Sequence, residues 1–169
     1  MKIIESLIAY SYEGFFMAGA GLSLLGIKLK INKLLSIAFI YGFFVFSIRN
    51  MYFILGIPLG THVFILMTVF TLLLRGIAKT NLLTSIIATL MSTLLIFWGE
   101  GVFLFPAVMI LKIDPIVFSS ARLGYTLLGI VLSDILLIIA FIIGYCLNKP
   151  LINLSGDKSD IGDKHEATK

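Results

Sequence analysis

Five long apolar segments constrain this chain more than any other feature of its sequence. A helix needs about 20 apolar residues to cross the hydrocarbon core of a bilayer. Only 13% of the 169 residues are charged, whereas about a quarter are charged in a typical soluble domain. The sequence therefore predicts an all-α, polytopic integral membrane protein of the cell membrane, with about five transmembrane helices at residues 3–25, 33–54, 59–76, 81–105 and 123–147.

The loops between these segments differ in positive charge, and this difference predicts the orientation of the chain. Cytoplasmic loops of membrane proteins are enriched in Lys and Arg. If the N-terminus is outside, the inner side receives nine of these residues, namely Lys28, Lys30, Lys33, Arg75, Lys79, Lys149, Lys158, Lys164 and Lys169. The outer side receives only Lys2, Arg49, Lys112 and Arg122. The bias favours an N-out, C-in bundle.

The composition changes abruptly after residue 147. Residues 1–147 form the predicted transmembrane domain, and residues 148–169 are rich in Asn, Gly, Asp, Ser and Lys. Because this tail has too little apolar surface to fold alone, we predict that it is disordered and cytoplasmic. Between the fourth and fifth spans, Asp114 and Pro115 have the residue types that favour a helix start, so a short interfacial helix is expected there.

Four ionisable residues are predicted near the outer ends of the spans. An ionisable side chain within a span costs about 2.5–3.5 kcal/mol on insertion scales and usually faces the bundle interior or an aqueous cavity. The N-out orientation brings four such residues to a similar depth, namely Glu5, Arg49, His62 and Glu100. They are predicted to line a pocket that opens outward and binds a ligand. The alternative is that Glu100 and Arg49 pair with each other and hold two helices in register.

Two further carboxylates, Glu13 and Asp134, are expected near the middle of their spans and apart from Glu100. Each can be neutral and hydrogen-bond to a neighbouring helix, which is a structural role. Each can also take part in a proton or cation relay, because intramembrane acids often mark such pathways. Both alternatives stay open on the sequence alone.

Catalysis, cofactor binding and nucleic-acid binding find no support in the sequence. The chain has no metalloprotease, nucleophile-elbow or phosphate-loop motif, and it has one cysteine and two histidines. A lone histidine lacks the ligand count that a metal site needs. The net charge of +4 is scattered and forms no basic face. We therefore expect a protein that is not an enzyme and has no cofactor or metal.

Several short stretches suggest a family. They are YEGFFMAGAGLSLLGIK (12–28), IRN (48–50), PLGTHVFI (58–65) and FWGEG (97–101), in this order. Together they resemble the N-terminal membrane sensor region of Gram-positive sensor histidine kinases with a sporulation-phosphotransferase-like core, which are related in architecture to the accessory-gene-regulator receptor. The resemblance covers about residues 1–147.

The departure from that family is the missing kinase part. In the family, the last span leads into a helix pair with the phospho-acceptor histidine and then an ATP-binding domain. Here only 22 residues follow Leu147, which is too few for a compact domain. The resemblance implies a bacterial, sensor-like membrane module for signal transduction, without kinase activity of its own.

Three functions are therefore considered. The first is a non-enzymatic sensor-like or regulatory membrane protein that binds an extracellular or membrane-partitioned ligand. It would act through a partner, such as a kinase or another membrane protein, or as a homo-oligomer. The alternative is a small-solute binding or transport subunit that uses the intramembrane carboxylates. The third is a structural membrane protein whose charges serve packing alone.

Overall fold

The computed structural model describes residues 2–57, 60–111 and 129–152, and the regular elements in these ranges are all helices. They are α1 (Lys2–Leu24), α2 (Ile31–Leu55), α3 (His62–Leu73), η1 (Leu74–Ala78), α4 (Leu82–Gly99), η2 (Glu100–Leu104), α5 (Phe105–Leu111), α8 (Ile135–Phe141) and η3 (Ile142–Cys146). The all-α prediction is confirmed for this part of the chain. The interfacial helix predicted at Asp114 and Pro115, and residues 153–169 of the predicted tail, lie outside the described residues.

Two helices are long and apolar enough to cross a membrane. They are α2 and the continuous helix Leu82–Ile110, which comprises α4, η2 and most of α5. Only 39% and 33% of their most apolar stretches are buried, whereas the core helix of a soluble protein is mostly buried. The other predicted spans correspond to α1 and to the shorter apolar helices His62–Ala78 and Ile135–Cys146. The number of spans and the orientation stay predictions.

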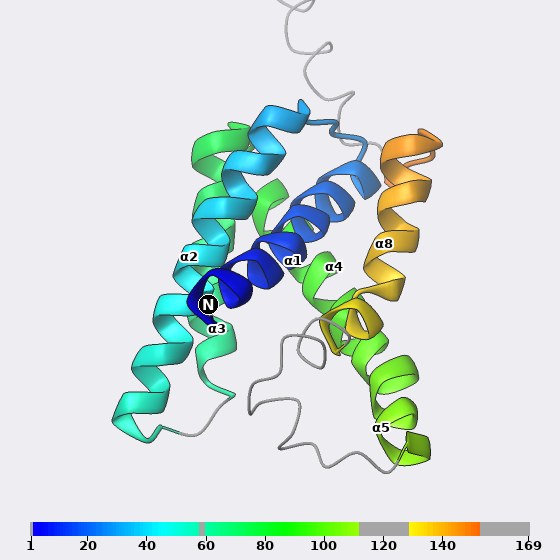
Figure 1. The fold of residues 1–169 in the computed structure, drawn as a ribbon. Helices are drawn as coiled ribbons and strands as arrows, with labels where there is room; N and C mark the ends of the chain where they lie inside the picture. The colour runs from blue at the N-terminus through cyan, green and yellow to red at the C-terminus, as the bar shows by residue number, and fades with distance from the viewer. Residues whose placement is uncertain (1, 58–59, 112–128, 153–169) are drawn as a thin grey trace, which may run out of the picture.

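Helix α1 is the central element of the bundle. It crosses the middle obliquely, with α2 and α3 on one side and α8 on the other (Figure 1). It packs most extensively against α2, and it also contacts α4, α8 and η3. From Met17 to Leu24 every residue of α1 is buried. This helix therefore has no face turned fully outward over its second half.

Glycines end the first two helices. Gly26 and Gly56 adopt left-handed φ angles of 79° and 63°, which glycine tolerates at low cost. After each, a backbone amide reaches back to the last turn: Ile27 N donates to Leu22 O over 2.9 Å, and Ile57 N donates to Tyr52 O over 3.1 Å. These bonds satisfy carbonyl groups that a helix end leaves open.

The end of α1 and the end of η3 are held together. The amides of Leu151 and Ile152 donate to Leu24 O over 2.9 and 3.0 Å. The hydroxyl of Tyr145 donates to Leu29 O over 2.9 Å. The α1–α2 loop, the η1–α4 connection and residues 147–152 therefore lie at one end of the bundle (Figure 1).

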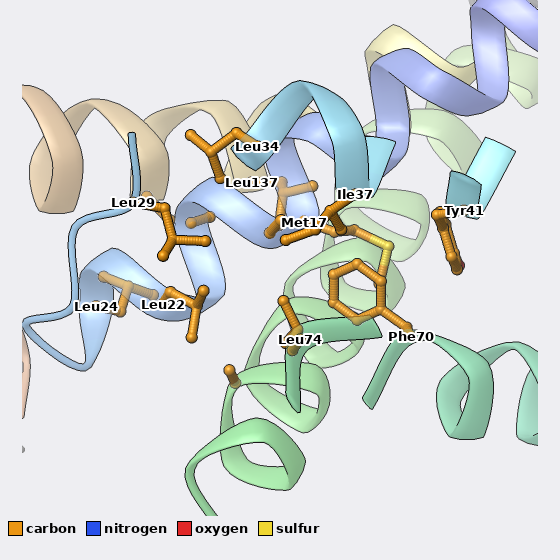
Figure 2. Close-up of a cluster of buried hydrophobic side chains, with 14 of the residues drawn as sticks. Met17, Leu22, Leu24, Leu29, Leu34, Ile37, Tyr41, Phe70, Leu74 and Leu137 are labelled. Atoms are coloured by element: carbon orange, nitrogen blue, oxygen red, sulfur yellow. The ribbon is translucent and has the colours of Figure 1, made fainter. Parts of the chain in front are cut away.

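A compact apolar cluster joins α1, α2, α3 and α8. Figure 2 shows Phe70 at its centre, beside Met17, Ile37 and Leu74. Phe70 is fully buried, and its ring lies 4.9 Å from that of Tyr41 in an edge-on arrangement. Aromatic pairs of this geometry stabilise a core beyond the area that they bury.

Helix α4 has its polar residues inside and its apolar residues outside. Its buried residues are all small or hydroxyl-bearing: Ser85, Ala88, Thr89, Ser92, Thr93 and Gly99. Its exposed side chains include Leu83, Leu90, Leu94, Phe97 and Trp98. Membrane helices associate through small residues and side-chain hydrogen bonds, since lipid chains are as apolar as leucine. This pattern favours a membrane environment for α4.

The buried hydroxyls of α4 bond across the bundle. Ser92 Oγ donates to the carbonyl oxygen of Met17 on α1 over 2.8 Å. Thr71 Oγ1, from α3, donates to Thr89 Oγ1 over 3.0 Å. A hydrogen bond also joins the hydroxyls of Thr80 and Ser85, which are 2.7 Å apart. The first two contacts fix α4 against α1 and α3, in addition to the apolar packing of Ala88 in the core.

Candidate functional site

Asp134 lies where the last helix is interrupted. A helical turn at residues 129–133 leads into it, and its φ and ψ of −88° and 1° depart from helical values before α8 begins. The side chain is 1% exposed, and neither carboxylate oxygen has a hydrogen-bond partner among the described residues. Buried polar groups are normally hydrogen-bonded, so this carboxyl group is an exception that calls for a role.

Gly99 brings α4 close to the same turn. A Cβ atom added at Gly99 would collide with the carbonyl oxygen of Ser133, so only glycine permits this approach. Glu100 follows Gly99 directly and begins η2, one of three five-residue π-helical segments in the described chain. Such segments occur frequently at functional sites.

Glu13, Glu100 and Asp134 form one acidic centre. Asp134 lies within electrostatic range of both glutamates, and Glu13 lies within range of Glu100 and Arg49. Glu100 is exposed, Glu13 is half-buried and Asp134 is fully buried. The predicted separation of Glu13 and Asp134 from Glu100 by depth stays a prediction. The close approach of Gly99 to Ser133 does place the helix that carries Glu100 against the turn that leads into Asp134.

Arg49 contacts a tyrosine rather than a carboxylate. Its Nη1 donates to Tyr10 Oη over 3.3 Å, and its guanidinium carbon lies 5.1 Å from the centroid of the Tyr10 ring. This is a cation–π contact between α2 and α1. No ion pair joins Arg49 to Glu100 in the described residues, although the two lie within electrostatic range. The alternative in which Glu100 and Arg49 pair to hold two helices in register therefore lacks the ion pair on which it depends.

His62 is buried at the start of α3. Its Nδ1 accepts a hydrogen bond from the amide of Gly60 over 3.1 Å, so this nitrogen carries no proton. Its ring packs edge-on against that of Tyr52, 5.7 Å away, and the Tyr52 hydroxyl accepts a hydrogen bond from Thr61 over 3.3 Å. His62 thus organises the turn before α3. It lies within electrostatic range of Arg49, which places it at the edge of the site.

Glu5 does not join the acidic centre in the described structure. It is half-buried in the first part of α1 and makes no side-chain hydrogen bond with any described residue. The predicted residues that the structure does bring together are Arg49, Glu100, Glu13 and Asp134. Tyr10, which contacts Arg49, was not among the predicted site residues. The only signal for it in the sequence is its place one turn before Glu13.

An open apolar groove of about 440 Å³ runs between α1 and α2. Its wall is formed by side chains from both helices: Ile8, Ser11, Tyr12, Phe15, Phe16, Leu35, Ala38 and Phe39. Ser11 is buried there, and its hydroxyl has no hydrogen-bond partner among the described residues. The remainder of the wall is apolar enough to face lipid.

Within the described residues, no group of three or more His, Cys, Asp or Glu side chains is arranged to hold a metal ion. The acidic centre therefore differs from a preformed metal site in its geometry. Comparison with known proteins found no family model, curated protein or solved structure that matches the chain. The resemblance to the sensor region of histidine kinases stays a prediction.

Proposed function

We propose that this chain is a non-enzymatic, sensor-like or regulatory membrane protein that binds a ligand at Arg49 and Glu100 and acts through a partner protein. The observation that supports this proposal is that both charged side chains are exposed on an otherwise apolar bundle, and they do not pair with each other in the described residues. Unpaired charges at such positions are costly, and within membranes they are functional by default. A ligand with an anionic and a cationic group would satisfy both.

The ligand site is tested by what the protein retains after mild solubilisation. The wild type, Arg49→Gln and Glu100→Gln are purified in parallel, and bound small molecules and lipids are identified by native mass spectrometry. We expect the wild type to retain a species that both variants lose. Lys30→Gln is the matched control, because Lys30 is also exposed but lies at the opposite end of α2. Equal retention by all four proteins would refute the ligand site.

The proposal includes five spans with the N-terminus outside. The α1–α2 loop, the η1–α4 connection and the stretch after η3 lie at one end of the bundle, and the stretch that follows α2 lies at the other (Figure 1). The sequence puts Lys28, Lys30, Lys79 and Lys149 in the first group of connections, which supports a cytoplasmic face there under the positive-inside rule.

Cysteine labelling tests this orientation. The native Cys146 is exposed, so it is first replaced by serine. In intact cells, a membrane-impermeant thiol reagent should label a cysteine that replaces Gly56, and it should label one that replaces Lys30 only after lysis. The opposite labelling pattern would reverse the orientation and move Glu100 to the cytoplasmic side.

A small-solute binding or transport subunit is the second candidate. It is favoured by the convergence of Glu13, Glu100 and Asp134, since carboxylates within a membrane bundle mark ion and proton pathways. Proton flux into liposomes that contain the purified protein would favour this candidate. Its absence, together with a co-purifying partner, would favour the sensor-like function.

A further inference from the structure

Asp134 stands out among the ionisable groups because the described structure offers it no partner. Both oxygens are buried and lack a hydrogen bond, and the side chain does not cap α8, although Asp134 occupies the N-cap position. An isolated carboxylate in such a place would cost far more than a neutral carboxyl group. A bound proton neutralises this charge. Unlike a metal ion or a larger ligand, a proton needs no space beside the carboxyl group.

Among the described residues, the titratable groups that act on Asp134 are acids and tyrosines. Glu13 lies near it from α1 and Glu100 from η2. The hydroxyls of Tyr12 on α1 and Tyr41 on α2 also lie within electrostatic range. Among the described residues, Arg49 is the cation whose charge acts on Glu13 and Glu100, and its guanidinium is bonded to Tyr10. A third negative charge beside two ionised glutamates would be repelled, which again favours a proton on Asp134.

The burial of the three acids also suggests a path. Exposure falls from Glu100, on the surface of η2, through the half-buried Glu13 to the fully buried Asp134. Gly99 holds the helix that carries Glu100 against the backbone next to Asp134. A proton leaving Asp134 would pass toward the glutamate carboxylates and then to water, and it would return by the reverse steps. Because Asp134 has no hydrogen-bond partner among the described residues, each transfer requires a side-chain movement or a bridging water molecule.

We propose that Asp134 is a proton-binding site that is occupied in the folded protein, and that it exchanges its proton with water by way of Glu100. The site goes beyond the function proposed above, because Asp134 is not part of the ligand site at Arg49 and Glu100. The two proposals share Glu100, and they remain distinguishable because the protonation of Asp134 is measured without a ligand. It also differs from a metal site, which would need several ligands around one point.

Infrared difference spectroscopy of the protein in lipid nanodiscs tests the proposal directly. A protonated carboxyl group has a carbonyl stretch that is separate from the carboxylate bands. At neutral pH we expect this band in the wild type, a shift of the band when aspartate is labelled with ¹³C, and its loss in Asp134→Asn. Absence of the band in the wild type, or an unlabelled-like band after aspartate labelling, would overturn the site.

The ¹³C label shows that the band comes from an aspartate, and the loss of the band in Asp134→Asn assigns it to Asp134. Asn has nearly the shape of the neutral acid, so Asp134→Asn should fold. The route is tested by moving the protein into deuterated water. The Asp134 band should shift more slowly in Glu100→Gln than in the wild type. In Lys30→Gln it should shift at the rate of the wild type. Equal rates in all three proteins would refute exchange through Glu100.

Discussion

Replacement of Gly99 by alanine is expected to lower the free energy of unfolding by about 2–3 kcal/mol, the upper part of the usual range for overpacking. The added methyl group would meet the carbonyl oxygen of Ser133, a backbone atom that cannot rotate away. Helix α4 or the turn before Asp134 must therefore shift. The higher helix propensity of alanine, about 1 kcal/mol, offsets only part of the cost.

Gly101 provides the matched control. It lies two residues further along the same continuous helix, and an added Cβ atom there would have no neighbour within 4 Å. Gly101→Ala should therefore be neutral or slightly stabilising. Both variants are compared with the wild type by thermal or denaturant unfolding in the same detergent. Equal stability of the two variants would show that the close approach of α4 to Ser133 does not exist in the protein.

The same two variants also test whether the close packing at Gly99 affects proton exchange at Asp134. If Gly99 holds Glu100 near Asp134, then Gly99→Ala should alter the exchange of the Asp134 proton as well as stability. Gly101→Ala should alter neither.

The helical class and the two longest apolar helices were predictable from the sequence because they depend on local composition. The predicted segment 33–54 lies within α2. The segment 81–105 begins one residue before the helix Leu82–Ile110 and ends inside it. The third segment, predicted to begin at residue 59, begins as a helix at His62. The difference arises because His62 accepts the Gly60 amide and closes a turn before the helix starts.

The convergence of the carboxylates was not predictable in the same way. If each span is a straight, upright helix, the sequence places Glu13 and Asp134 near the middle of the membrane and Glu100 near its outer side. The oblique path of α1 and the interruption of the last helix at Asp134 are tertiary features (Figure 1). Gly99 is visible in the sequence, but nothing in one sequence says that it faces Ser133.

The sequence of α4 contains a polar helix face that the sequence analysis did not interpret. Ser85, Thr89 and Ser92 recur at intervals of four and three residues, which is the spacing of one helix face. In a soluble protein, a polar face of this kind turns toward water. In α4 it turns inward, where α1 and α3 supply hydrogen bonds to Ser92 and Thr89, as expected for a helix with apolar surroundings.

Replacement of Phe70 by alanine should lower the free energy of unfolding at least as much as Gly99→Ala does. Phe70 is fully buried at the centre of the cluster in Figure 2, where it meets the ring of Tyr41 edge-on. Phe→Ala changes in protein cores cost about 3–5 kcal/mol through lost contacts and the cavity that remains. If α3 crosses a bilayer as proposed, the lipid chains outside it are as apolar as the core, and the transfer part of this cost is smaller. We therefore expect a loss of about 3 kcal/mol.

Phe64 is the control, because it lies on the same helix but is 72% exposed. Its removal leaves no internal cavity, so Phe64→Ala should change the free energy of unfolding by less than about 0.5 kcal/mol. The two variants have the same change in composition and differ only in the face of α3 that they alter. If Phe64→Ala were as costly as Phe70→Ala, the outward face of α3 would be buried against another protein chain rather than lipid. That outcome would point to the partner-binding surface that the sensor-like function requires.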